Sequence, residues 1–156
     1  MNKKFSRVGV CALIINKTGK VLLGKRHQDP QKADSELHGE GSWTLPGGKL
    51  EFLEKPKKAC IRETLEETGI KIKKLEFFSV SNDMVPDAHF VTIGFLAKEF
   101  KGEPKVMEPD EITEWRWFNQ AELPDKIFLS SRKALDNYFN KNYYHPDEDI
   151  DGRYAK

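Results

Sequence analysis

The chain has 156 residues, a length that fits one domain with a substantial hydrophobic core. Its composition, 38% hydrophobic and 33% charged with a net charge of +1, gives no bulk attraction to nucleic acids or acidic membranes. The two cysteines, Cys11 and Cys60, have no CxxC spacing, which argues against a zinc site and a disulfide scaffold and favours buried thiols. Without a leader pattern or an apolar run of roughly 20 residues, a cytoplasmic location is expected.

The N-terminal part of the chain predicts two strands joined by a turn. Residues 8–15 are apolar and rich in β-branched side chains, which predicts a strand buried on both faces. A polar turn containing Gly19 follows, and residues 21–26 are expected to return as the second strand of a hairpin.

A long polar segment, residues 27–41, predicts a loop because it shows no periodicity. Loops of this length often close over a substrate, although a tolerated surface insertion fits equally well. Its histidines, His27 and His38, are either substrate contacts or simply solvated. Residues 43–45 predict a short extended piece leading into Pro46-Gly47-Gly48, which predicts a sharp turn where backbone can approach a ligand closely.

Residues 55–68 give the clearest helical prediction in the chain. Pro56 suits the first turn, where its missing N–H is not needed, and Gly69 suits a left-handed C-terminal cap. The expected apolar stripe consists of Ala59, Cys60, Ile61 and Leu65.

The rest of the chain predicts further strands and one more helix. Strands are expected over residues 72–80, 89–97 and 112–118, loops over 81–88 and 98–109, and a helix over 130–139 with Ser130 or Ser131 as its cap. Residues 1–140 are predicted to form a single domain, followed by a polar, loosely ordered tail over 141–156.

Three glutamates of the predicted helix, Glu63, Glu66 and Glu67, project from one side because their spacing is i, i+3, i+4. Like charges at this spacing destabilise an isolated helix. Either the three form a solvated face with Arg62 and nearby lysines, or they bind a cation. Mg²⁺ fits the second interpretation, since it takes carboxylate oxygens and bridges to substrate phosphates.

The spacing of the whole segment favours the cation. From Gly48, five residues lead to Glu54, and seven more lead to the run Arg62 to Ile70. This resembles the Nudix box, with every charged and glycine position matched and Thr64 standing where an aliphatic residue is preferred. The similarity covers roughly residues 7 to 140 and extends to pieces that look like the MutT-related branch, which hydrolyses nucleoside triphosphates: residues 21–26, 45–52, 91–93, 107–109 and 115–117.

The resemblance implies an α/β architecture, the Nudix fold, in which a mixed β-sheet lies between helices (α/β/α) and the box forms a loop–helix–loop. It also implies a divalent metal, Mg²⁺ with Mn²⁺ as an alternative, held by Glu63, Glu66, Glu67 and the carbonyl of Gly48. Glu54 corresponds to a structural or outer-sphere glutamate. Arg62 corresponds to an arginine that pairs with the glutamates and orients them, which is a positioning role.

The family chemistry also requires a carboxylate that takes a proton from the attacking water. Glu63 is the first candidate for this base. Glu108 and Glu111, which precede the predicted strand over 112–118, are the downstream candidates, with Glu111 preferred, and each is otherwise a solvated loop acid.

Substrate recognition is less clearly encoded. Gly47 and Lys49 are candidates for phosphate contacts, and Phe90 and Thr92 for nucleobase contacts, although Phe90 is otherwise a core residue. Phe128-Leu129 stands where relatives of this branch often carry an aromatic residue that stacks on the base. Leu129, the candidate at that position, departs from the pattern.

The predicted activity is hydrolysis of a nucleoside triphosphate to a nucleoside monophosphate and pyrophosphate. One alternative is a nucleoside diphosphate sugar such as ADP-ribose as substrate, and another is a nucleotide sensor without turnover. The expected partner is a small-molecule nucleotide, with no nucleic acid and no membrane, and relatives of this branch are often homodimers.

Overall fold

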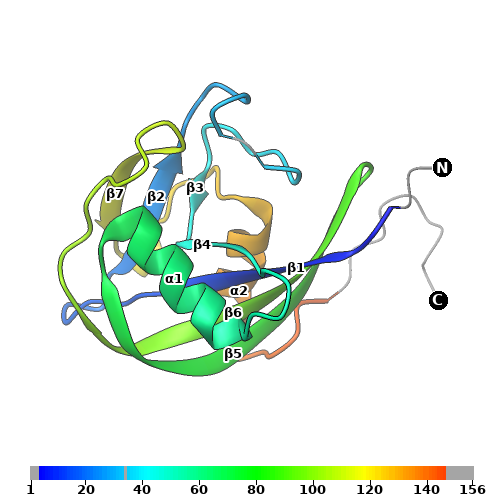
Figure 1. Ribbon diagram of the computed structural model, residues 1–156. Helices are drawn as coiled ribbons and strands as arrows, with labels where there is room; N and C mark the ends of the chain where they lie inside the picture. Colours follow the sequence, from blue (N-terminus) through cyan, green and yellow to red (C-terminus); the bar gives the residue numbers. More distant parts are fainter. Residues whose placement is uncertain (1–3, 34, 147–156) are drawn as a thin grey trace.

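Two β-sheets and two α-helices are formed by the residues that this computed structural model describes, 4–33 and 35–146 (Figure 1). In chain order the elements are β1 (Arg7–Leu13), β2 (Val21–Arg26), β3 (Trp43–Thr44), β4 (Gly47–Lys49), α1 (Pro56–Thr68), β5 (Lys71–Val85), β6 (Ala88–Lys101), β7 (Ile112–Phe118), a 3₁₀ turn (Gln120–Glu122) and α2 (Leu129–Asn140). None of the described helices is long and apolar enough to cross a membrane.

The strands divide between a mixed sheet and an antiparallel one. The first has the order β4-β1-β6-β5, with β1 parallel to β6 and antiparallel to β4, and the second has the order β3-β2-β7. The expected mixed sheet and α/β class are therefore confirmed.

The predicted hairpin between the first two strands is wrong. The edges of β1 are occupied by β4 and β6, so β2 pairs with β3 and β7 in the other sheet. The two strands meet only near the turn, through a bridge between Ile15 and Val21 and a hydrogen bond of 3.1 Å from Leu22 N to the Ile14 carbonyl.

The predicted loop over residues 81–88 is also wrong. β5 continues to Val85 and β6 begins at Ala88, so the two form a long hairpin that turns at Pro86-Asp87. Its polar residues Ser81 and Asp83 are buried on the sheet instead of lying in a solvated turn. β6 also runs on to Lys101, four residues into the second predicted loop.

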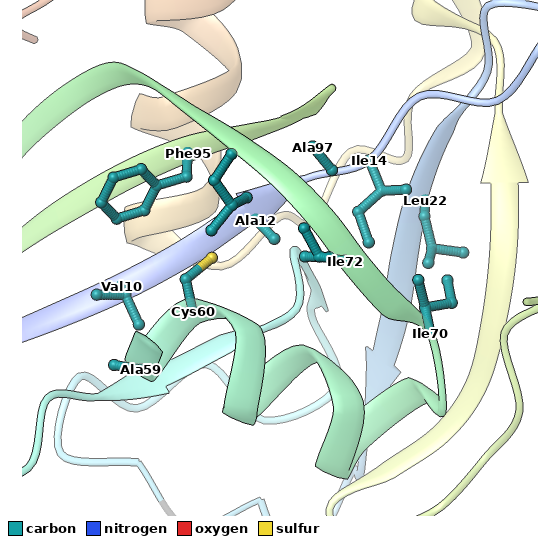
Figure 2. Close-up of a cluster of buried hydrophobic side chains, with 11 residues drawn as sticks. Val10, Ala12, Ile14, Leu22, Ala59, Cys60, Ile70, Ile72, Phe95 and Ala97 are labelled. Atoms are coloured by element: carbon teal, nitrogen blue, oxygen red, sulfur yellow. The ribbon is translucent and has the colours of Figure 1, made fainter. Parts of the chain in front are cut away.

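The alternating side chains of β1 form cores on both faces of the mixed sheet. Val10, Ala12 and Ile14 pack with α1, as Figure 2 shows, whereas Cys11 and Leu13 pack in the cluster that contains α2. The two helices therefore cover opposite faces, and the predicted two-sided burial of this strand is confirmed.

Both thiols are buried, as expected. Cys11 lies in the α2-side core and Cys60 in the α1-side core. Burial is the main cause that raises the pKa of both thiols, that of Cys60 to about 12, so neither group is an accessible thiolate at neutral pH.

The predicted helix boundaries hold well for α1. Lys55 is its N-cap, Pro56 opens the first turn, and Gly69 caps the C-terminus with a φ of 76°. The buried face differs from the prediction, because Thr64 is fully buried while Leu65 is 41% exposed. Thr64 thus fills the position where the family pattern prefers an aliphatic residue.

The C-terminal end of the described chain packs on β5. Val80 N donates to the Tyr143 carbonyl at 2.8 Å, and His145 N donates to the Val80 carbonyl at 3.2 Å. Residues 143–145 therefore have defined contacts, and the rest of the predicted tail, 147–156, lies outside the described residues. The domain boundary at residue 140 stays a prediction.

Candidate active site

The Arg62 guanidinium joins the carboxylates of the helix and its preceding loop in one network. Its Nε and Nη2 atoms donate to the two carboxylate oxygens of Glu54 at 2.9 and 3.0 Å, a bidentate pair. Its Nη1 atom donates to Glu63 Oε1 at 2.9 Å and to Glu66 Oε2 at 3.3 Å. The hydrogen bond with Glu54 is the main cause that raises the pKa of Arg62. This residue therefore lies where an orienting arginine is expected.

Glu54 has the contacts of a structural residue. Besides Arg62, its carboxylate accepts a hydrogen bond of 3.1 Å from the backbone N–H of Glu51. The Arg62 hydrogen bond is the main cause that lowers the pKa of Glu54, so this carboxylate is charged and held in place.

Gly47 and Gly48 lie in β4 without a positive φ, and the chain bends at Pro46 just before them, so the predicted turn is found at the first residue of this triplet. The predicted close approach is found. A Cβ atom on Gly48 would lie 2.4 Å from the carboxyl carbon of Glu63, and one on Gly47 would lie 2.1 Å from the Val10 carbonyl oxygen. The Gly47 N–H donates to Glu67 Oε2 at 2.9 Å. Both glycines thus bring backbone against the carboxylates.

The carboxylates around this strand raise one another's proton affinity. Burial is the largest cause that raises the pKa values of Glu63, Glu67 and Glu108. Repulsion adds to burial, from Glu66 at Glu63 and from Glu111 at Glu67 and Glu108. A partly buried cluster of like charges is stabilised by a cation.

The donor set is suited to a hard divalent ion, since it consists of carboxylate oxygens and a backbone carbonyl. Within residues 4–33 and 35–146, however, no three Asp, Glu, His or Cys side chains meet closely enough to hold one ion. Glu63 is turned toward Arg62, and Glu67 toward the Gly47 N–H. Glu66 is half-exposed and also bonded to Arg62. Metal binding by these glutamates stays a prediction, and it requires their side chains to turn.

A cavity of about 240 Å³ opens beside the acidic cluster. The predicted phosphate and nucleobase contacts Gly47, Lys49, Phe90 and Thr92 all line it. So do the predicted site residues Gly48, Glu63, Glu67 and Glu111, together with Glu108.

Three predicted residues are not among those that line the cavity. Arg62 and Glu66 lie outside it, and Leu129 is replaced by its neighbour Phe128. Phe128 is the N-cap of α2, and the Arg26 guanidinium carbon lies 4.7 Å from its ring centroid. An aromatic side chain is thus present at the cavity after all, one position earlier than Leu129.

The loop over residues 27–41 forms part of the cavity wall. Ser35 and Leu37 line the cavity. Arg26 holds the loop by donating to the carbonyls of Ala33 and Gly39 at 2.6 and 3.2 Å. This position fits the substrate-loop interpretation, and its role in turnover stays a prediction.

Contacts between polar and charged side chains attach the same loop to the sheet. Glu36 pairs with Arg7 and lies 3.4 Å from Lys49 Nζ, and His38 pairs with Asp87 at 3.1 Å. Neither His38 nor His27 lines the cavity.

Sequence reasoning missed a polar wall at the start of α2. Ser130 and Ser131 line the cavity and do not cap the helix, whose N-cap Phe128 makes no side-chain capping bond. Ser131 Oγ accepts a hydrogen bond of 2.9 Å from Leu45 N and lies 3.0 Å from Thr44 Oγ1. The sequence signal is a pair of adjacent serines before an apolar helix, a pattern that predicts an N-cap and not a cavity wall.

Comparisons with known proteins agree with this geometry. The family model described as NUDIX domain matches residues 5–138. An ADP-ribose pyrophosphatase from Methanocaldococcus jannaschii is 35% identical over 127 residues, covering 80% of this chain and 69% of that protein. An 8-oxo-dGTP diphosphatase from Proteus vulgaris is 34% identical over 103 residues, covering 66% of this chain and 85% of that protein. The crystal structure of a MutT NUDIX hydrolase from Burkholderia pseudomallei superposes with a TM-score of 0.75 at 35% identity. The match covers 85% of this chain and 98% of that protein.

Proposed function

Since this chain belongs to the NUDIX family and is a pyrophosphohydrolase acting on nucleotides, we propose that its substrate is a nucleoside triphosphate. The products are a nucleoside monophosphate and pyrophosphate. One observation carries this proposal: a single cavity joins the acidic cluster at Gly48 to a wall formed by Phe90, Thr92 and Phe128. The cluster suits the phosphates, and the wall suits the nucleoside.

The proposed metal is Mg²⁺, with Mn²⁺ as the alternative, bound by Glu63, Glu66, Glu67 and the Gly48 carbonyl. When bound, the ion neutralises phosphate oxygens and activates the attacking water. Arg62 orients the carboxylates of Glu63 and Glu66 through its hydrogen bonds.

Two residues compete for the role of general base. Glu63 lines the cavity and its pKa is raised by burial, which suits a group that takes a proton. Glu111 also lines the cavity, and its segment is anchored by His27 N, which donates to the Glu111 carbonyl at 2.8 Å. We propose Glu63 as the base and Glu111 as the alternative.

A nucleoside diphosphate sugar remains the second candidate substrate. The loop over residues 27–41 contributes to the cavity wall, and the M. jannaschii relative is an ADP-ribose pyrophosphatase. The nucleotide sensor is set aside, because every carboxylate of the box is retained and the family assignment is to hydrolases.

A substrate panel tests the proposal. The protein is incubated with Mg²⁺ and normal and oxidised nucleoside triphosphates, ADP-ribose, and a 5′-triphosphorylated oligonucleotide, and products are identified by chromatography. Pyrophosphate with a nucleoside monophosphate is expected. Ribose 5-phosphate from ADP-ribose as the main product selects the second candidate, and preferred cleavage of the oligonucleotide contradicts the expected absence of nucleic-acid partners.

A glutamate outside the acidic cluster provides a control for the test of the metal ligands. Glu67→Gln removes one proposed ligand, whereas Glu103→Gln changes an exposed glutamate after β6. Loss of hydrolysis in the first variant alone supports the ligand assignment. The cytoplasmic location and the homodimer stay predictions.

A further inference from the structure

Asp83 is a fully buried carboxylate that the proposed chemistry does not use. Its Oδ2 atom accepts hydrogen bonds from Ser81 Oγ at 3.1 Å and from Thr92 Oγ1. Its Oδ1 atom accepts no hydrogen bond from the described residues but lies 3.9 Å from the ammonium nitrogen of Lys133. Burial raises the pKa of Asp83, whereas the hydroxyl donors Thr92 and Ser81 and the Lys133 ammonium oppose this shift because each of them favours the anion.

Lys133 is buried as well, which is unusual for a lysine. Its Nζ atom donates to the Asn82 carbonyl at 2.7 Å, so the ammonium lies between β5 and α2 with Asp83 as its counter-ion. A buried pair that lost one member would leave an uncompensated charge. The ammonium of Lys133 therefore favours the ionised form of Asp83.

An ionised Asp83 determines whether the Thr92 hydroxyl acts as a donor or as an acceptor toward a ligand. A threonine hydroxyl has one proton, and Thr92 gives that proton to Asp83, so its oxygen offers only lone pairs to other partners. Thr92 also lines the cavity. The cavity wall thus carries a hydrogen-bond acceptor, which a ligand must meet with an O–H or N–H group.

Gly9 leaves room for a ligand beside this acceptor. Gly9 pairs with Thr92 across the sheet and also lines the cavity. The position that a Cβ atom on Gly9 would take lies 3.3 Å from Thr92 Oγ1 and 3.6 Å from the Gly48 carbonyl oxygen. The two oxygens are therefore at most about 7 Å apart, the total of these two distances.

That proximity identifies which part of the substrate lies at Thr92. With the pyrophosphate at Gly48, the group that reaches Thr92 must belong to the moiety attached directly to the phosphates. In every nucleotide this moiety is the pentose, ribose or deoxyribose, whereas the exocyclic amino groups of the base lie at the far end of the molecule. We propose that Thr92 accepts a hydrogen bond from a ribose hydroxyl, and that Asp83 is the positioning residue that makes it an acceptor. This inference rests on the proposed nucleotide substrate and makes the site selective for sugars that carry the hydroxyl group bound by Thr92.

Binding without turnover tests this inference separately from hydrolysis. Dissociation constants are measured by calorimetry in EDTA for the four common ribonucleoside monophosphates, their 2′-deoxy and 3′-deoxy analogues, and IMP. We expect the ribonucleotide to bind about 3- to 10-fold more tightly than one of the two deoxy analogues, the difference that one hydrogen bond makes. The analogue that loses affinity identifies the hydroxyl.

Variants of similar size assign the effect to the Thr92 oxygen. Thr92→Val should bind the ribonucleotide and that analogue equally, and Thr92→Ser should restore the preference. Thr113→Val, in an exposed threonine on β7, should keep the preference. Asp83→Asn should reduce the preference although Thr92 is retained, because an amide can donate to Thr92 and release its hydroxyl proton.

Each other outcome overturns a defined part of the inference. Equal binding of ribonucleotide and both deoxy analogues by the wild-type protein, or a preference that persists in Thr92→Val, overturns the role of Thr92. A difference between AMP and IMP that disappears in Thr92→Val places the base at Thr92 and overturns the ribose assignment. No binding of any nucleotide overturns the proposed function as well, whereas binding without a sugar preference leaves that function standing.

Discussion

At the residue scale, a substitution at Glu67 can remove activity while it keeps the hydrogen bond that this side chain makes in the fold. Its side chain is 8% exposed, and its carboxylate accepts the Gly47 N–H. Glu67→Gln keeps an acceptor for that N–H but removes the charge that a divalent ion needs. We expect kcat/KM to fall by more than about 100-fold, beyond the loss typical of residues that only support a ligand. A steady-state assay with saturating Mg²⁺ measures this, with Glu103→Gln as the control.

Arg62 is the second prediction at this scale. Arg62→Lys keeps a positive charge but loses the bidentate contact with Glu54 and the shared contact with Glu63 and Glu66. We expect kcat/KM to fall about 10- to 100-fold and the Mg²⁺ concentration for half-maximal activity to rise. Arg116→Lys, in an exposed pair with Glu114, serves as the control. An unchanged Mg²⁺ requirement in Arg62→Lys contradicts the orienting role.

At the element scale, the loop over residues 27–41 can be tested through its glycines. Gly39 has a φ of 90°, and a Cβ atom there would lie 2.7 Å from the Phe128 ring. Gly39→Ala should therefore cost about 1–2 kcal/mol of stability from the left-handed backbone. It should also displace Phe128 and raise KM severalfold.

The matched control for that loop is Gly19→Ala. Gly19 has a φ of 78° and no atom within 4 Å of the Cβ position, so the substitution should cost similar stability with no change in KM. Thermal unfolding and steady-state kinetics of both variants give the comparison. An unchanged KM in Gly39→Ala would show that the contact between the loop and Phe128 does not influence substrate binding.

The elements differ in how far they could be predicted. Helix α1 was predictable because Pro56, Gly69 and the spaced glutamates are local signals. The β5–β6 hairpin was not, because Ser81 and Asp83 are polar yet buried, and Lys133, the counter-ion of Asp83, is distant in sequence. Local patterns identify polar residues but not the partners that allow them to be buried.

The same limit applies to the site. The box identified Arg62 and the glutamates, whose spacing lies within one helix and its preceding loop. Phe128, Ser130 and Ser131 reach the cavity only because α2 packs against β5 and its first turn meets β3. Such contacts depend on the tertiary arrangement of elements, which the sequence does not show directly.

At the scale of the whole molecule, the carboxylates make stability depend on pH and metal. A carboxyl whose folded-state pKa is raised binds its proton more tightly in the folded protein. Its stabilising contribution is complete below the unfolded value of about 4 and is lost as pH rises through the folded value. Glu67 is the strongest case, because burial raises its pKa well above the ordinary range. Glu54 and Asp87 have lowered pKa values, so they lose their contribution only at lower pH.

The metal-free protein should therefore unfold at a higher temperature at about pH 5.5 than at about pH 7.5. Glu67→Gln should reduce this difference in unfolding temperature, because the neutral side chain does not titrate. The variant therefore distinguishes the contribution of Glu67 from that of the histidines. Mg²⁺ at about 100 times its Kd should add about 2.7 kcal/mol at the higher pH, since only the folded protein assembles the site. It should add less at the lower pH, where protons compete for the carboxylates. Calorimetry at both pH values, with added Mg²⁺ or with EDTA, measures these four states. Equal Mg²⁺ stabilisation of the wild-type protein and Glu67→Gln at pH 7.5 would exclude Glu67 as a ligand.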